Sequence, residues 1–248
     1  MQGHDGRRTG AQAYDTAAYK LAADDILTGA GVDLRFHVQA VGAVMDGERI
    51  DAILVETKSG RGAIRARTFI DCSGDADLAA WAGAPYALGA DDGFLAFPTL
   101  MFRLGNVNDD VAENEGRHKL RELIAEANAS GAYTLPRKAG IIRGQAHGGE
   151  WRANLTQISR DGGPINGANA DDLAYAEVQG RRQVQEYFRF LRDKVPGFEK
   201  AYLLETAAQV GIRETRRIQG NHLLDGEDVL NCRDFDDSIG ANGWPLET

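Results

Sequence analysis

Two groups of polar residues in this 248-residue chain could take part in chemistry. The first is IDCSGDAD at residues 70–77. In it, Ser73 and Gly74 follow a short apolar run and lie between aspartates. A glycine at so sharp a turn permits a positive φ angle, or lets a ligand approach the backbone closely. The alternative is a strand-to-helix turn that touches no ligand, because a single glycine is weak evidence for a site.

The second group is the arginine-rich segment GIRETRR at residues 211–217. Guanidinium groups at Arg213, Arg216 and Arg217 could clamp a carboxylate or phosphate through paired hydrogen bonds. The alternative is a solvated face on which these arginines form ion pairs, for example with Glu214. The sequence alone leaves both interpretations open.

Composition excludes several classes of partner and site. The formal net charge is −9 and no long basic block occurs, so neither nucleic acid nor an anionic membrane is expected as a partner. No apolar run approaches the roughly 20 residues of a spanning helix, and no signal peptide is recognised, so we expect a cytoplasmic protein. Cys72 and Cys232 fit a reducing compartment, with a single disulfide as the alternative. The scattered histidines predict no metal site.

The elements that must position the first group follow one another closely. An N-cap at Asp15 or Thr16 predicts a helix over residues 15–27, with an apolar face that includes Tyr19 and Ile26. Hydrophobic patterning then predicts strands at residues 32–36, 38–45, 49–58 and 63–70, with a hairpin at Asp46-Gly47. The glycine turn and a helix over residues 75–82 complete a corner typical of ligand contacts in α/β proteins.

Beyond residue 88 the pattern becomes mixed. Tyr86, Phe94 and Phe97 could wall a flat aromatic ligand, although core packing is the more frequent use of such residues. Hydrophobic periodicity predicts helices and strands in the order strand 97–104, helix 111–129, strand 150–159, helix 171–193, strand 202–208 and helical turn 227–230.

Five stretches resemble, in order, bacterial FAD-dependent oxidoreductases whose flavin domain is built like that of glutathione reductase. They are AYKLAADDILTGAGVDLRFHVQAVG, ARTFIDCSGDADLAAWAGAPY, FPTLMFRLGNV, GRRQVQEYFRFLRDKVPGFEKAYL, and QVGIRETRRIQG followed by EDVL. The resemblance implies an α/β fold, α+β overall, with an incomplete FAD/NAD(P)-binding-type domain, a β-meander and an inserted α+β substrate domain. The implied domains are a partial FAD-binding domain (residues 1–88), a substrate or cap domain (89–210) and a return segment (211–248).

The resemblance also implies roles for individual residues. The segment at residues 70–77 corresponds to a second flavin-contacting corner of the family, and the strand near residue 40 gives a backbone contact to the adenine. The return segment faces the flavin and substrate, which makes Arg213 the candidate catalytic cation. The implied cofactor-binding residues are Ala40, Cys72, Ser73, Gly74, Asp75 and Asp77.

The chain departs from the family pattern at both ends, because it contains neither the opening G-x-G-x-x-G nor the closing flavin segment. We therefore expect a fragment of a longer enzyme that uses FAD on a small organic substrate, and a chain that alone binds FAD weakly or not at all and is inactive. The alternative is a non-catalytic module, completed by a partner chain that supplies the nucleotide-binding strand; a homo-oligomer is left open. No histidine pairs with an acid at suggestive spacing, and Asp71, Asp75 and Asp77 are explained as turn and cap residues.

Overall fold

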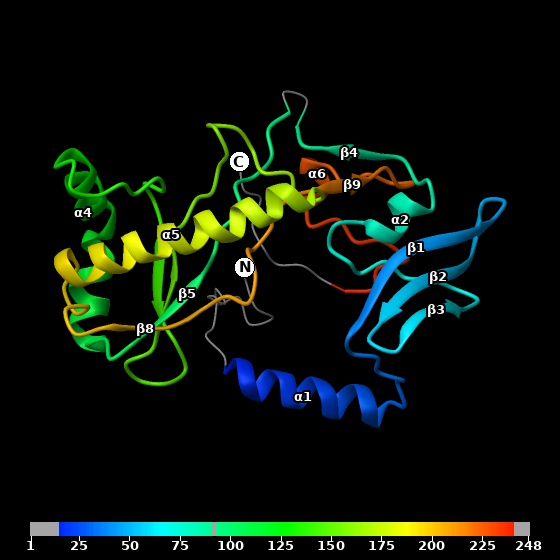
Figure 1. The fold of residues 1–248 in the computed structure, drawn as a ribbon, viewed down its shortest axis with the longest axis horizontal. Coiled ribbons are helices and arrows are strands. Elements are labelled where there is room, and N and C mark those ends of the chain that lie inside the picture. The colour runs from blue at the N-terminus through cyan, green and yellow to red at the C-terminus, as the bar shows by residue number, and fades with distance from the viewer. Residues whose placement is uncertain (1–14, 91–92, 241–248) are drawn as a thin grey trace. The chain divides into compact units, whose positions relative to one another are not determined.

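The computed structural model describes residues 15–90 and 93–240 (Figure 1). The chain divides into a main unit, Tyr14–Ile218, and a smaller unit formed by Met1–Ala13 and Gln219–Thr248. The first ten residues, whose polar and glycine-rich sequence predicts a loop, lie outside the described part. None of the helices in the described ranges is both long and apolar enough to cross a membrane.

The described strands form three sheets, pair only in antiparallel fashion, and occur together with helices along the chain. This mixture confirms the predicted fold class, α/β and α+β overall. The first sheet is the meander β1 (Val38–Asp46), β2 (Arg49–Thr57) and β3 (Gly60–Arg65). The second pairs β4 (Tyr86–Leu88) with β9 (Arg216–Ile218). The third has the order β6 (Ile141–Gly144), β7 (Trp151–Asn154), β5 (Phe102–Gly105) and β8 (Tyr202–Thr206).

The first helix, α1 (Thr16–Gly29), begins where the sequence predicts. The carboxylate of Asp15 accepts hydrogen bonds from the backbone N–H groups of Ala17 and Ala18, which confirms the N-cap. The expected burial of its apolar face is wrong, because α1 contains no buried residue and Ile26 is 70% exposed. Periodicity defines an apolar face, but burial also requires an element that packs on it.

Before residue 71, two predicted strands are absent or shortened, and further along the chain the strands predicted at 97–104 and 150–159 are reduced to Phe102–Gly105 and Trp151–Asn154. Residues 32–36 form no strand, and β3 ends at Arg65 instead of continuing to residue 70. A strand exists only where a neighbour completes its hydrogen bonds, and Ile70 is 81% exposed. Helix α2 (Asp77–Trp81) also starts later than predicted, because Ala76 has a left-handed conformation with φ 55°. The predicted corner therefore retains its turn and helix but not its strand.

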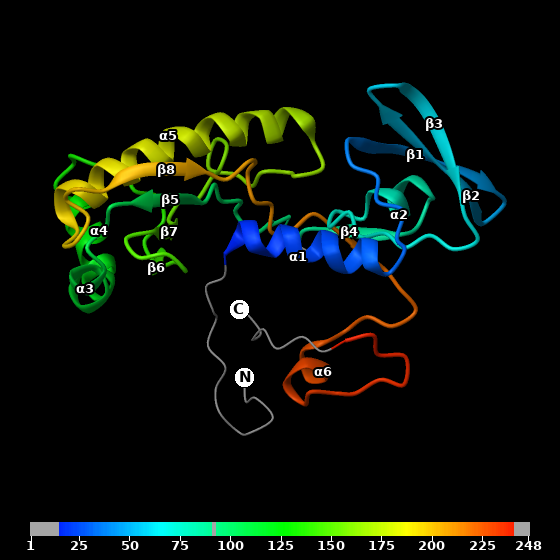
Figure 2. The same cartoon turned by 90° about the horizontal axis from the view of Figure 1, so that it is seen from below.

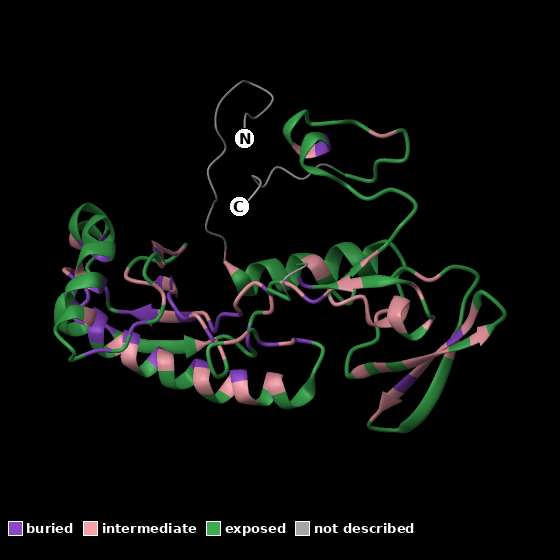
Figure 3. Cartoon of the chain, turned by 90° about the horizontal axis from the view of Figure 1, so that it is seen from above, coloured by how far each residue is buried: buried purple, intermediate pink, exposed green. Residues whose placement is uncertain are grey.

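The main hydrophobic core lies between residues 100 and 210 (Figure 3). Helix α5 (Ala170–Lys194) runs along strands β5 and β8 (Figure 2) and buries the predicted face that includes Ala176, Gly180 and Val184. The helix predicted at residues 111–129 consists of α3 (Asp109–Val111), a π-helical segment (Ala112–Gly116) and α4 (Arg117–Ala129).

The smaller unit is described from residue 219 to residue 240 and contains α6 (Gly226–Leu230). Asp225 caps this helix through a capping box with Asp228, since each side chain accepts a backbone N–H of the other residue. The structure thus confirms the helical turn predicted for this segment.

Candidate functional site

A cavity of about 350 Å³ brings the predicted corner and the return segment together. Ser73, Gly74 and Asp75 line it from the corner, and residues 211–215, which include Arg213, line it from the return segment together with the two residues before it, 209 and 210. Gly74 has φ 84°, and no heavy atom lies within 4 Å of the position that a Cβ would occupy there. The backbone of the corner therefore faces open space that a ligand can enter.

Three hydrogen bonds hold the corner against the return segment. The buried Thr215 hydroxyl donates to Asp75 Oδ1 at 2.6 Å. Arg216 Nη1 donates to Asp77 Oδ1 at 2.7 Å and to the carbonyl of Asp75 at 3.0 Å. The hydrogen bond to Asp77 raises the pKa of Arg216 above its ordinary value. These contacts link residues about 140 positions apart and fix the cavity's two walls.

The turn itself is closed by Asp71 and Ser73. The Asp71 carboxylate accepts the backbone N–H groups of Ser73 and Ala79, each at 2.9 Å, and Ser73 Oγ accepts the N–H of Asp77 at 2.9 Å. Partial burial by itself raises the pKa of Asp71, but the hydrogen bonds from Ala79 and Ser73 outweigh it and lower the pKa. These bonds account for Asp71 as a turn residue.

Ion pairing divides the three arginines of the return segment. Arg216 is bound to Asp77, and Arg217 donates to Glu214 Oε1 at 2.9 Å and to the carbonyl of Gly89. Among the described residues, Arg213 alone of the three makes no hydrogen bond or ion pair, and it is exposed. The three arginines therefore form no common clamp, and Arg213 is the cation that remains available.

A second cavity, of about 200 Å³, shares Arg213 with the first. Phe94 and Phe97 line it with their rings edge to face, 5.7 Å apart between centroids, and Arg137 lines it as well. Tyr86, which was grouped with these phenylalanines, lies instead beside the guanidinium of Arg216, 5.7 Å from the ring centroid. Sequence reasoning missed Arg137, because it lies in a glycine-rich segment with no distinctive pattern.

The remaining predicted site residues lie outside these cavities. Ala40 is in β1 beside an irregularity between Ala40 and Gly42, and its carbonyl accepts the Gln39 side-chain amide at 3.4 Å. Cys72 adjoins the corner, but its thiol is exposed and free, as is that of Cys232. Asp77 is engaged by Arg216, so Ser73, Gly74 and Asp75 are the predicted contacts that face the larger cavity.

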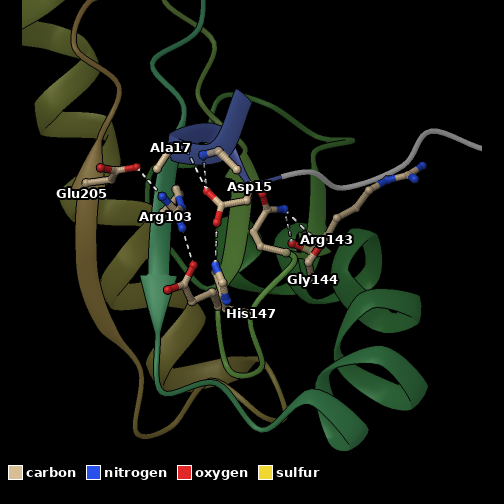
Figure 4. Close-up of polar contacts among 10 residues, drawn as sticks. Asp15, Ala17, Arg103, Arg143, Gly144, His147 and Glu205 are labelled. Carbon is tan, nitrogen blue, oxygen red and sulfur yellow. Dashed lines mark hydrogen bonds and ion pairs between the residues drawn. The ribbon is translucent and has the colours of Figure 1, made fainter. Parts of the chain in front are cut away.

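A third cavity, of about 250 Å³, lies between the start of α1 and the β6–β7 loop (Figure 4). Its charged groups are paired with one another. Arg103 binds Glu150 and Glu205, and His147 Nε2 lies 3.1 Å from Asp15 Oδ2. The hydrogen bond to Glu205 is the main reason that the pKa of Arg103 is raised. This pairing leaves no charged side chain of the described lining without a partner.

Two histidines are paired with acids that sequence spacing did not indicate. Besides His147, His222 Nε2 lies 2.8 Å from Asp228 Oδ2 in the smaller unit, and Arg233 Nη1 binds Asp228 Oδ1 at 2.9 Å. Arg233 first, and His222 second, lower the pKa of Asp228. Within residues 15–90 and 93–240, no three His, Cys, Asp or Glu side chains are grouped to hold a metal ion.

Comparison with known proteins gives one family and one structure. A family model described as FAD dependent oxidoreductase matches residues 1–248. No curated protein matches the chain. A solved structure, from structural and functional studies of BexE concerned with oxidation during BE-7585A biosynthesis, is 17% identical, with a TM-score of 0.47. That match covers 82% of this chain and 34% of the length of the other chain.

Proposed function

The chain belongs to the family of FAD-dependent oxidoreductases, and on this basis we propose that it takes part in flavin-dependent oxidation or reduction of a small organic substrate. FAD is the cofactor of the family, and when bound it supplies the electron and hydride chemistry. The observation that carries the proposal is that Gly74 and Arg213 line the same cavity. The sequence-based hypothesis would have failed had these two residues lain apart.

The residues of the corner fit a contact with FAD through the backbone. Gly74 has open space in place of a side chain. Among the described residues, the backbone N–H groups of Gly74 and Asp75 donate no hydrogen bond, so both can donate to a ligand. Negative charge at Asp75 and Asp77 opposes a phosphate, so these donors suit an uncharged part of the cofactor.

Arg213 is the candidate catalytic residue at the open side of this cavity. Its guanidinium would hold an anionic group of the substrate, or stabilise negative charge that develops during the reaction. Arg216 has a positioning role, since its bonds to Asp75 and Asp77 hold the corner in place. The predicted roles of Ala40 and Cys72 in cofactor binding, and the domain boundaries at residues 88 and 210, stay predictions.

Titration of the chain with FAD, followed by backbone amide chemical shifts, tests the proposal even where binding is weak. We expect saturable shifts at residues 73–75 and 211–215. Gly74→Val should weaken these shifts, because the side chain would occupy the open space and strain the positive φ angle. Gly131→Val is the matched control, since Gly131 also has a positive φ (70°) and open space. Shifts confined to other residues at millimolar FAD would contradict the proposal.

An alternative function is a non-catalytic module completed by a partner chain. Uncovered apolar side chains favour it, since Ile26, Phe36 and Ile70 are 70%, 68% and 81% exposed. The backbone around residue 70 is irregular and forms no strand in the described chain. A strand from a partner chain would supply the hydrogen bonds that this backbone lacks. The gene sequence distinguishes the two functions. A G-x-G-x-x-G motif after an apolar strand, encoded upstream in the same reading frame, supports the enzyme. The same motif encoded in a separate gene supports the module.

A further inference from the structure

We propose that the cavity of about 200 Å³ beside Arg213 binds a small organic monocarboxylate, with its carboxylate on the arginines and its apolar body on Phe94 and Phe97. This proposal names a substrate class for the proposed function. It rests on that function in one respect, which is that the cavity lies beside the site of the redox reaction. Binding to the cavity requires only residues of this chain, so it can be measured without flavin.

The charge of the lining selects an anion. Two arginines line the cavity, and none of its described lining residues is acidic. Glu214, the acid next to Arg213 in sequence, is engaged elsewhere: it accepts the backbone N–H of Ala96 at 3.1 Å and binds Arg217 at 2.9 Å. Arg213 therefore keeps its positive charge for a ligand, and a planar guanidinium matches a carboxylate with two parallel hydrogen bonds.

The second cation is held in position before any ligand arrives. Arg137 Nη1 donates to Asn154 Oδ1 at 2.6 Å and to the Asn154 carbonyl at 3.2 Å. The backbone of Arg137 is held as well, because its N–H donates to the hydroxyl of the buried Tyr187 at 2.9 Å and its carbonyl accepts from that hydroxyl. Fixing a binding group in advance lowers the entropic cost of binding.

The size and the walls of the cavity define the rest of the ligand. Its volume of about 200 Å³ is below the roughly 300–1,000 Å³ of pockets that hold drug-sized ligands, so one ring or a short chain fits. The rings of Phe94 and Phe97, whose centroids are 5.7 Å apart, present an aromatic edge and an aromatic face to the cavity. The described lining residues include no acidic group to receive an ammonium, so they favour a simple carboxylate over a zwitterionic amino acid.

Calorimetric titration of the 248-residue chain with benzoate, and with benzamide as a neutral ligand of the same shape, tests this site. We expect saturable binding of benzoate and at least 10-fold weaker binding of benzamide. Arg213→Gln should weaken benzoate roughly 10- to 150-fold, the value of a hydrogen bond to a charged group, and leave benzamide unchanged. Arg121→Gln on α4 removes the same charge from an exposed residue outside the cavity and should bind benzoate as the unmodified chain does.

A second variant separates the charge from the apolar wall. Phe94→Ala should weaken benzoate but not acetate, which has the charge without the ring. Equal affinity for benzoate and benzamide, or equal loss in Arg213→Gln and Arg121→Gln, would overturn the proposal; thermal unfolding shows whether each variant is folded. If benzoate binds as expected while FAD produces no shifts at residues 73–75, the carboxylate site stands and the proposed function fails.

Discussion

The hydrogen bond from Thr215 to Asp75 is the contact on which the shared cavity depends most directly. Thr215 is 3% exposed, and its hydroxyl donates to Asp75 Oδ1 at 2.6 Å. Thr215→Val replaces the hydroxyl with a methyl group, so it removes the donor without leaving a large cavity. Hydrogen bonds to charged groups contribute roughly 1.5–3 kcal/mol to stability, and partial exposure of Asp75 places this one at about 1.5 kcal/mol.

Urea unfolding measures this loss. For an m value of roughly 1–3 kcal/mol per M, a loss of about 1.5 kcal/mol lowers the midpoint by about 0.5–1.5 M. Amide hydrogen exchange should show the loss locally, with faster exchange at residues 77–81. Thr134→Val is the control, because Thr134 is exposed and its hydroxyl makes no hydrogen bond among the described residues. The free energy of unfolding of this control variant should change by less than about 0.5 kcal/mol.

A double-mutant cycle with Asp75→Ala assigns the effect to this pair of residues. If the two side chains interact as the structure shows, the double variant should lose about 1.5 kcal/mol less than the sum of the single variants. Strictly additive losses would refute the reasoning, because they would mean that Thr215 and Asp75 contribute independently. They would also leave Arg216 as the main link between the corner and the return segment.

Three further predictions concern the core, the turn and the site. Gly180→Ala should cost about 1–3 kcal/mol in urea unfolding, because its Cβ would lie 2.9 Å from Leu100 Cβ, whereas Gly29→Ala, with no atom within 4 Å, should be close to neutral. The lowered pKa of Asp71 adds stability above pH 3.8, and this stability is lost as the pH falls below that value. The thermal unfolding midpoint of Asp71→Asn should therefore depend less on pH between 3 and 5 than that of the unmodified chain. Equal dependence in the two proteins would contradict the role of Asp71 in the turn. Arg213→Ala in the flavin-loaded protein should lower turnover far more than stability, and unchanged kinetics would remove this residue from the site.

Local patterning predicted the elements whose formation depends mainly on nearby residues. The apolar face of α5, with Ala176, Gly180 and Val184, was readable because helical periodicity and Pro196-Gly197 define both the face and the end of the helix. The hairpin after Asp46 was readable because Gly47 supplies the positive φ, 59°, that its turn needs. The family resemblance likewise placed Gly74 and Arg213 near a common ligand.

Strand formation and burial could not be predicted in this way. Residues 32–36 and the segment around Ile70 have strand-forming composition, but a strand needs a hydrogen-bonding neighbour, and none is present in the described chain. Ile26 shows the same for burial, since an amphipathic helix buries its face only where another element packs on it.

The sequence by itself determined the order of the elements, the glycine at the corner and the presence of three arginines in the return segment. Only the tertiary structure decided which arginine is available. Asp77, about 140 residues away along the chain, pairs with Arg216, while Glu214 pairs with Arg217, and Arg213 is left facing two cavities. Ion pairs form between groups that folding brings within a few ångströms, and separation along the chain does not reveal which groups those are.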